Sequence, residues 1–518
     1  MAGRPDVHRG ASMRGLIINA LYLEAVIIAA IAIYFSALKL EEKRQLQRSL
    51  AIVAVATPIL AFFSPNLIVF NLCCFFIIPL VARDRVQVVP LFVFMMVTTP
   101  LVSQDLKLGG TFLFRYGVGH SIGLGALVAV VLREGWNGRP LGRWDVPFLA
   151  IVLLLWLSNS RDTAISNYAR EAVQATLTFI VPYFVVSRGL RRNTDIKLVL
   201  VALGAAAIVL SMVCLFETAK TWPIYRSVWS HYGIELGSGA SVKLRSGLIR
   251  SPGPYPEPLT LSFALTICIL ALISVRTSIR SRLHFIGLCA IVGLGILAPQ
   301  ARGAWIALLV ALFAADMYQG RWRSVSIRAA LLSVALVALL GAASVSSKVA
   351  TIAGLTAEGR GTIDYRKNLL SRGIEEVKKK PLLGDSPVNV TNKMSDLMQG
   401  EGIVDFVNGY LYTALISGLI GLATMVLALA GQLWLIVSGR PRRHGNELAY
   451  SQLSFAFSAV AATIVMLGNI SFGGTTLMLF GFMAAIAGTA SAAARRNAKR
   501  QRRERDGNID LPIGAVPG

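Results

Sequence analysis

Acidic residues are scarce in this chain. Its 518 residues include only 27 Asp and Glu against 51 Lys and Arg, and charged residues make up 15% of the sequence. Soluble globular domains carry about 25% charged residues. This shortage, together with 55% hydrophobic residues, excludes an ordinary soluble protein and indicates a polytopic membrane protein.

Paired cysteines and nucleotide-binding loops are also missing. The five cysteines lie in apolar stretches without paired spacing outside them, at Cys73, Cys74, Cys214, Cys268 and Cys289. We interpret them as buried thiols, neither disulfides nor metal ligands. The absence of a glycine-rich phosphate loop and of an internal repeat argues against an enzyme driven by a cytosolic nucleotide. We expect no cofactor and no metal.

Long apolar blocks dominate what is present. In a bilayer such blocks satisfy their backbone hydrogen bonds only as helices, so the sequence predicts an all-α fold with about 14 transmembrane helices and a large helical periplasmic loop. The first 85 residues leave the count open between 14 and 15. The blocks lie near 15–36, 49–63, 66–82, 87–103, 117–133, 145–159, 172–188, 196–217, 257–275, 283–298, 303–318, 327–345, 409–437, 448–467 and 472–492.

Two long polar connections divide these blocks. The predicted organisation is N-terminal transmembrane helices at 1–217, a periplasmic loop at 218–256, central transmembrane helices at 257–345, a large periplasmic loop with an amphipathic helix at 346–408, C-terminal transmembrane helices at 409–492 and a basic cytoplasmic tail at 493–518. With both loops outside, every alternate short loop after residue 82 carries Arg or Lys, as the positive-inside rule requires.

The formal charge of +24 is explained mainly by this asymmetry. The tail, "RRNAKRQRRER" at 495–505, is expected to contact anionic membrane lipids, and no nucleic-acid partner is expected. We therefore predict a multi-pass membrane protein whose two long polar loops lie on the side opposite the basic short loops.

Three arginines fall at the periplasmic side of this topology. Residues 362–380 predict a helix with Thr362 as N-cap. Its predicted apolar stripe carries Arg366 toward the membrane body and consists of Ile363, Leu370, Ile374 and Val377; a snorkelling arginine is the alternative. Arg302 lies between two spans, with Pro299 and Gly303 expected to break the helix around it. A guanidinium there is costly unless it faces a polar cavity or partner.

Arg250 precedes a proline-rich segment in the other long loop. The prolines at 252, 254, 256 and 258 predict a stiff, extended connector, and Glu257 stands at the entry to the next helix, where it can also serve as a helix N-terminal charge. Four aromatic residues of this loop are open to two interpretations, stacking on sugars or an interfacial belt. They are Trp222, Tyr225, Trp229 and Tyr232.

Three convergent arginines favour a ligand with several negative oxygens, because guanidinium groups bind phosphate through paired hydrogen bonds and stay charged. On this side of the membrane a lipid-linked diphosphate is the obvious candidate. We therefore predict Arg250, Arg302 and Arg366 as a diphosphate-binding set.

The chain resembles the O-antigen ligase and Wzy-type polymerase superfamily of bacterial envelope glycosyltransferases. The resemblance covers roughly 240–425 and consists of "QARGAW" at 300–305, "RKNLLSRGIEEVKKKPLLGDSP" at 366–387, and Asn408, Gly418 and Gly421 in the spacing of the family's third motif. It implies inverting transfer of a glycan from an undecaprenyl diphosphate carrier to a sugar hydroxyl, without a nucleotide sugar or an essential metal.

One position departs from the family pattern. Ligases of this family carry histidine where this chain has Val407, which cannot accept a proton. Asp405 is the nearest replacement, followed by Glu401, so Asp405 is expected to be catalytic with Arg302 and Arg366. Asp405, Asn408, Glu401 and Glu257 form the predicted acceptor side. Capping of the helix that begins near residue 409 is the other interpretation of Asp405 and Asn408.

The missing histidine favours a repeat-unit polymerase for exopolysaccharide or O-antigen. A ligase that passes finished glycan to lipid A core is the alternative in the same class, and a lipid-linked oligosaccharide flippase is the alternative from another class. The expected partners are the undecaprenyl-diphosphate-linked glycan, membrane lipids, a chain-length regulator and a flippase.

Overall fold

The computed structural model describes residues 13–134, 140–234, 244–245, 248–346, 350, 357–398, 404–441 and 446–505. Over these residues the chain is almost entirely helical, and every predicted apolar block lies on a helix. The described strands form two small antiparallel sheets, β1 with β2 and β3 with β4. The all-α prediction is therefore correct apart from these two hairpins, which connect helices.

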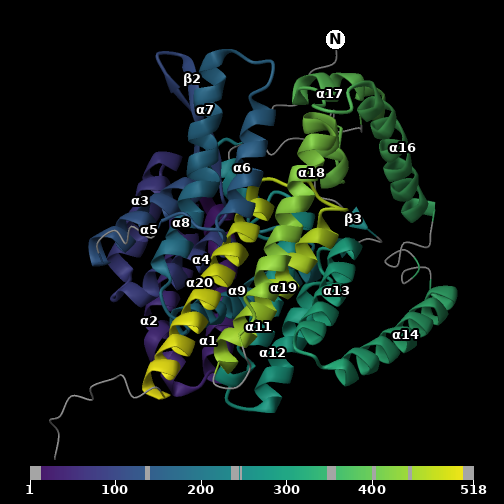
Figure 1. Ribbon diagram of the computed structural model, residues 1–518. Helices are drawn as coiled ribbons and strands as arrows, with labels where there is room; N and C mark the ends of the chain where they lie inside the picture. Colours follow the sequence, from purple (N-terminus) through teal and green to yellow (C-terminus); the bar gives the residue numbers. More distant parts are fainter. Residues whose placement is uncertain are drawn as a thin grey trace, which may run out of the picture.

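The elements are named as in Figure 1. The first half of the chain contains α1 (Met13–Ala37), α2 (Leu40–Phe63), α3 (Leu67–Val81), α4 (Arg85–Thr98), β1 (Ser103–Leu108), β2 (Thr111–Gly117), α5 (Val118–Glu134), α6 (Val146–Asn159), α7 (Ile165–Ala175), the π-helix η1 (Thr176–Ile180), α8 (Val181–Gly189), α9 (Asn193–Lys220), α10 (Arg226–His231), β3 (Leu244–Arg245) and β4 (Leu248–Ile249).

The second half contains α11 (Pro258–Ser274), the 3-10 turn η3 (Arg276–Ser278), α12 (Arg282–Gly295), α13 (Arg302–Tyr318), α14 (Trp322–Val345), α16 (Ala357–Lys379), α17 (Pro387–Lys393), the 3-10 turn η4 (Ser395–Leu397), α18 (Gly409–Ser438), α19 (Glu447–Met466) and α20 (Gly474–Arg505). Helix α18 contains a break at Gly418.

Several helices have the length and apolar composition of membrane spans. Among the described residues, six helices are long and apolar enough to cross a bilayer: α1, α2, α9, α18, α19 and α20. Shorter apolar helices, α3 to α6, α11 and α12, lie beside them. The protein is therefore a multi-pass membrane protein, whereas the count of about 14 spans stays a prediction.

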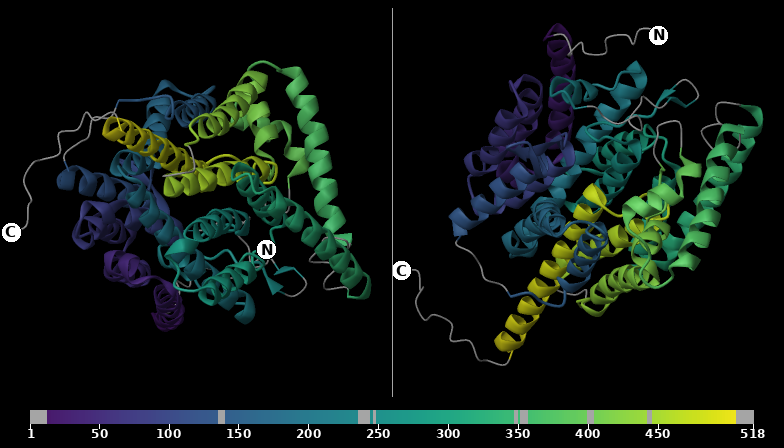
Figure 2. Two further views of the ribbon diagram at one scale, coloured as in Figure 1. Left: turned by 60° about the horizontal axis from the view of Figure 1, so that its bottom comes forward. Right: turned by 90° about the horizontal axis from the view of Figure 1, so that it is seen from above.

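Helix α9 forms the centre of the bundle and packs against α1, α4, α11 and α12. Its run "VALGAAAIVLS" is rich in small residues, which allow close approach of neighbouring helices. At Gly204 a Cβ atom would lie 2.5 Å from the hydroxyl oxygen of Tyr34, and that hydroxyl donates to the carbonyl of Val201 at 2.8 Å. Figure 2 shows the other helices arranged around this core.

Helix α19 organises the second half, between α13 and α20. Helix α13 runs antiparallel to it, because Gly303 lies against Asn469 after the end of α19, and Tyr450 near its start donates to the carbonyl of Tyr318 at 3.0 Å. We call the end with Arg302 the site end and the end with Tyr318 the opposite end. The 20 residues of α19 separate the two by roughly 30 Å at 1.5 Å per residue.

Helices α16 and α17 pack on the N-terminal part of α18 at the site end, whereas α14 extends away from the bundle (Figure 1). Helix α16 begins at Ala357, so the prediction of Thr362 as its N-cap is wrong. Its buried face carries Leu369 and Gly373, while Ile363, Leu370 and Ile374, which we assigned to the apolar stripe, are exposed. Arg366 still lies on the buried face.

Two other local predictions need correction. The block at 87–103 ends as a helix at Thr98, and residue 103 already begins β1. The proline-rich connector is not extended, because residues 253–257 form turns and bends before Pro258 starts α11. Gly253 adopts a φ of +53° there, a conformation that side chains rarely allow and that lets the chain fold back.

Candidate functional site

The turn before α13 organises one side of the site. Arg302 is the first residue of α13, and Gln300 adopts a left-handed φ of +52°, which costs energy for any residue but glycine. The strained turn presents its carbonyl groups to the preceding loop. Arg250 donates from Nε to the carbonyl of Pro299 at 3.1 Å, and Arg245 donates from Nη1 to the carbonyl of Gln300 at 3.3 Å.

Burial and like charge act together on Arg250. Burial lowers its pKa, the positive charges of Arg245 and Arg302 lower it further, and the net value is about 10. Glu257 opposes this shift and Arg366 adds to it. Arg250 stays charged at neutral pH, so the site concentrates positive charge where desolvation makes it costly. Such a site favours an anion.

Arg366 reaches the same region from α16. Its Nη1 donates to Oδ1 of Asn469 at 2.6 Å, and its Nε is buried without a hydrogen-bond partner among the described residues. Burial lowers the pKa of Arg366, and the carboxylate of Asp405 opposes the shift. A buried guanidinium with an unused donor is expensive, and a ligand oxygen would satisfy it.

Asn469 joins the two sides of the site. It lies in the turn between α19 and α20, and a Cβ atom at Gly303 would come within 2.6 Å of its amide carbon. Gly303 therefore lies inside the first turn of α13 and makes room for Asn469, which corrects its predicted role as a helix breaker. Because Asn469 also accepts from Arg366, it connects the start of α13 to α16.

Sequence reasoning missed Asn469. It belongs to none of the motifs, and its stretch "LGNISFGG" carries only the signal of a turn between two apolar helices. A polar amide in a short turn at the site end was the one available hint.

A small apolar cluster holds α16 against α18. Leu369 of α16 packs with Leu411 and Leu415 of α18, and a Cβ atom at Gly373 would meet the side chain of Leu411 at 2.8 Å. Close approach at Gly373 therefore brings the whole face of α16, including Arg366 one turn beyond Leu369, onto the body of the protein.

The Pro-Leu-Leu-Gly motif docks into the break of α18. At Gly418 the backbone leaves the helix with φ 67° and ψ −169°. The amide of Leu419 consequently donates to the carbonyl of Pro381 at 2.8 Å, and that of Ile420 donates to the carbonyl of Leu382 at 3.3 Å. A Cβ atom at Gly418 would lie 2.2 Å from the Leu382 carbonyl oxygen. Gly418 thus provides a docking point for the loop that follows α16.

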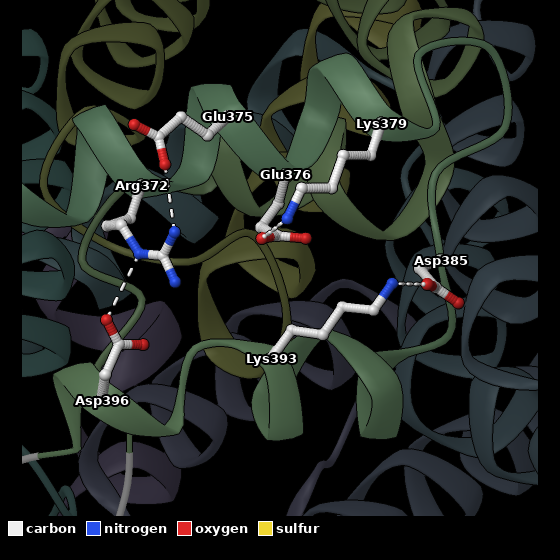
Figure 3. A network of polar contacts seen from close by, with 7 residues as sticks. All are labelled: Arg372, Glu375, Glu376, Lys379, Asp385, Lys393 and Asp396. Atoms are coloured by element: carbon white, nitrogen blue, oxygen red, sulfur yellow. Dashed lines mark hydrogen bonds and ion pairs between the residues drawn. The ribbon is translucent and has the colours of Figure 1, made fainter.

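Polar contacts fasten α17 to the same unit (Figure 3). Asp385 accepts from Lys393 at 2.6 Å and from Asn389 at 3.0 Å, and Lys380 forms an ion pair with it at 3.0 Å. Burial raises the pKa of Asp385, but these hydrogen bonds outweigh it and hold the pKa well below its usual range. Arg372 connects α16 to η4 through Asp396 at 3.3 Å.

The segment before α18 supplies the predicted acceptor side. Asn408 caps α18, since its Oδ1 accepts from the amides of Tyr410 and Leu411, each at 3.1 Å. The capping interpretation of Asn408 is therefore confirmed. Val407 packs into the apolar cluster of α16 and α18, so the position of the family's histidine is used for packing.

Asp405 is fixed at the backbone by Tyr365 of α16. The Tyr365 hydroxyl donates to the carbonyl of Asp405 at 3.2 Å and accepts from its amide at 3.1 Å. Asp405 also interacts electrostatically with Arg366, so its carboxylate lies on the same side of the site as that arginine. Glu401, the second predicted base, lies outside the described residues.

Glu257 is exposed and directly precedes α11, where its side chain makes no capping hydrogen bond. It acts electrostatically on Arg250, so it belongs to the rim of the same site. Glu217, which the sequence did not single out, holds the preceding segment: it accepts from the Ser251 hydroxyl at 2.5 Å and from the Gly253 amide at 3.1 Å.

The loop aromatics pack rather than face an open site. Tyr225 and Trp229 are 2% and 4% exposed, so they cannot stack on a sugar. Tyr232 stacks on Phe70 at 5.8 Å between ring centroids. The sugar-stacking interpretation is therefore wrong for these three residues.

Across the described residues, no group of three or more His, Cys, Asp or Glu side chains could hold a metal ion. The five cysteines are free thiols; Cys74, Cys214 and Cys268 are buried as predicted, whereas Cys73 and Cys289 are partly exposed, which corrects their prediction as buried thiols.

Comparison with known families agrees with the resemblance. Residues 287–426 match the family model described as O-antigen ligase. The match covers less than half of the chain, and over these residues it agrees with the resemblance to the O-antigen ligase and Wzy-type superfamily. The matched range contains Arg302, Arg366 and Asp405, whereas Arg250 and Asn469 lie outside it. No curated protein matches the chain.

Proposed function

We propose that the chain, whose residues 287–426 match the family model described as O-antigen ligase, polymerises oligosaccharide repeat units carried on undecaprenyl diphosphate. The reaction would take place at the periplasmic face of a bacterial inner membrane. The observation that carries the proposal is the convergence of Arg250, Arg302 and Arg366 at the site end, with Asp405 beside them.

The arginines would bind and stabilise the leaving group. Attack by a sugar hydroxyl on the anomeric carbon forms a new glycosidic bond, and the bond to the carrier's phosphate oxygen breaks with its electron pair. Negative charge therefore grows on the diphosphate. Cationic donors already held in position stabilise that charge without reorganising, and removal of one such donor costs about 3 kcal/mol of barrier.

Asp405 would receive the proton of the attacking hydroxyl. The chain carries Val407 at the position of the family's histidine, so an imidazole at that point of the motif cannot serve as the base. Asp405 lies two residues earlier and interacts with Arg366, which would keep the acceptor close to the diphosphate. The transfer would be a single displacement with inversion, without a nucleotide sugar or a metal.

The test uses the purified protein in lipid nanodiscs with a lipid-linked repeat unit, and it monitors the formation of a glycan ladder. The wild type should produce the ladder, and Arg302→Ala and Arg366→Ala should each lower its rate on the order of a hundredfold. Lys367→Ala provides the matched control, because Lys367 is the exposed next residue of α16 and its loss removes the same charge. Full activity of both arginine variants would refute the proposal.

Ligase activity is the second candidate, because the matched family model is described as O-antigen ligase. The same preparation, given carrier-linked glycan together with lipid A core, separates the two. A polymerase lengthens the carrier-linked glycan when the core is absent. A ligase leaves its length unchanged and transfers it once to the core.

A further inference from the structure

A basic cavity lies at the opposite end of the bundle. It has a volume of about 550 Å³ and is formed where α9 and α19 begin and where α20 passes them. Its lining includes Arg191, Arg192, Asn193, Asn446, Glu447 and Arg496. The length of α19 separates it from the candidate site, so the proposed transfer reaction does not explain it.

Positive charge predominates around this cavity. Among the described residues, three arginines line it against a single carboxylate, Glu447. Arg496 donates from Nη2 to the carbonyl of Arg191 at 2.6 Å, which fixes α20 at the start of α9. The nearby carboxylate of Asp195 is already engaged, because it accepts from Arg85 at 3.2 Å and from the amide of Arg191 at 3.1 Å.

An unused amide adds a second, independent sign of a ligand. Asn446 is 9% exposed, lines the cavity, and its Oδ1 has no hydrogen-bond partner among the described residues. It precedes α19 without capping it, so the first amides of α19 receive nothing from this side chain. A buried polar side chain without a partner is costly, and a bound group that hydrogen-bonds to it would remove the cost.

The chemistry of the lining selects the ligand class. Guanidinium groups form paired charge-assisted hydrogen bonds to phosphate oxygens, and the uncapped start of a helix adds amide donors and a favourable dipole. The cavity opens at an end of an apolar bundle, where lipid head groups collect. We propose that this cavity binds a phosphate-ester anion, supplied by an anionic phospholipid head group or by a soluble phosphate compound.

Two arms of one experiment distinguish the sources. In the first, the full-length protein is reconstituted in nanodiscs containing phosphatidylglycerol, and retained anionic lipid is counted by native mass spectrometry. In the second, the protein in nanodiscs of phosphatidylcholine alone is titrated with inorganic phosphate and with glycerol 3-phosphate by calorimetry.

The variants distinguish binding in the cavity from a general effect of positive surface charge. Arg192→Gln/Arg496→Gln removes two lining charges, and Asn446→Asp adds a negative charge with almost no change of shape. Arg282→Gln/Arg323→Gln serves as the control, since both residues are exposed, lie at the same end and carry the same charge. Both cavity variants should lower lipid retention or phosphate affinity by about tenfold, and the control should leave it unchanged.

If the cavity variants retain less anionic lipid, the ligand is a phospholipid head group. If they bind phosphate or glycerol 3-phosphate more weakly in the titration, the ligand is a soluble phosphate compound. Equal lipid retention in the control and cavity variants, with no heat of phosphate binding, would overturn the proposal. Asn446→Asp keeps the test decisive if the double variant fails to fold.

Discussion

Arginines at the two ends of the bundle have different partners. At the opposite end, Arg188 lies against the carboxylate of Asp145 at 2.7 Å, and both side chains are almost fully buried. At the site end, the hydrogen bonds of Arg250 and Arg366 go to neutral oxygens, the Pro299 carbonyl and the Asn469 amide. The charge of Arg188 is neutralised within the fold, whereas Arg250 and Arg366 are oriented by groups that leave their charge available.

This difference separates structural from functional charge. A guanidinium paired with a buried carboxylate has its charge neutralised, so it attracts no further anion. Removal of the guanidinium leaves the carboxylate buried without a partner. A guanidinium held by a carbonyl or an amide keeps its attraction for an incoming anion. When no anion is bound, its uncompensated charge lowers the stability of the folded protein. Arg188 and Arg366 should therefore respond differently to the same substitution.

The largest expected effect is on folding, at Arg188. Arg188→Ala would leave Asp145 buried without its charged partner, which typically costs about 3–5 kcal/mol. Thermal unfolding of the purified variant should show a strong loss of stability. Arg282→Ala, an exposed arginine of the same end, should unfold like the wild type. A stable Arg188→Ala would remove the distinction between the two ends.

The next effect is on rate, at Arg366. Arg366→Ala should lower ladder formation on the order of a hundredfold, corresponding to about 3 kcal/mol of barrier, and should leave thermal stability nearly unchanged. Rate and unfolding are measured on the same preparation. If Arg366→Ala unfolds as readily as Arg188→Ala, the arginine is structural and the comparison fails.

A smaller effect is expected at the break in α18. Gly418→Ala would force a side chain into a positive-φ conformation and against the Leu382 carbonyl, at a cost of roughly 1–3 kcal/mol. Hydrogen exchange of residues 381–397 should quicken, and ladder formation should fall with it. Gly293→Ala is the control, since nothing lies within 4 Å of a Cβ atom there. Unchanged exchange in Gly418→Ala would show that this junction does not hold α16 and α17.

Asn469 should act through Arg366 and more weakly than it. Asn469→Ala removes the acceptor at 2.6 Å, and we expect kcat to fall by about tenfold, roughly 1.4 kcal/mol, with KM nearly constant. Asn469→Asp keeps an acceptor and should recover most of the rate. A change confined to KM would mean that Asn469 affects substrate binding instead of the position of the guanidinium.

The smallest effect concerns pH and Asp385. Since the pKa of this carboxyl is lowered in the folded protein, its contribution to stability is complete above about pH 4 and is lost as pH falls through the folded pKa. Asp385→Asn should destabilise the protein by about 1 kcal/mol at neutral pH. Unfolding measured across pH should show the two proteins converging below pH 4. A constant difference would mean that the ion pairs of Figure 3 are not its source.

The motifs indicated which residues to examine, but not how they meet. Arg302 and Arg366 were found from their positions between apolar blocks and on a helix face. Their electrostatic interaction with Arg250, which lies 116 residues before Arg366, depends on the strained turn at Gln300. Asn469 carried no motif, because an asparagine acquires its role only from the neighbours that the fold provides. The apolar stripe on α16 was predicted to include Leu370, which is exposed, whereas the neighbouring Leu369 is buried. Sequence alone did not separate the two, because their side chains are identical.

By itself the sequence determined the helices and the sign of the charge at each end, because apolar length and backbone hydrogen bonding in a bilayer allow little else. The tertiary structure alone decided which arginines keep their charge available. That choice depends on whether a carboxylate, a carbonyl or an amide lies within hydrogen-bonding distance of a guanidinium, and such proximity arises only when segments distant in the chain pack together.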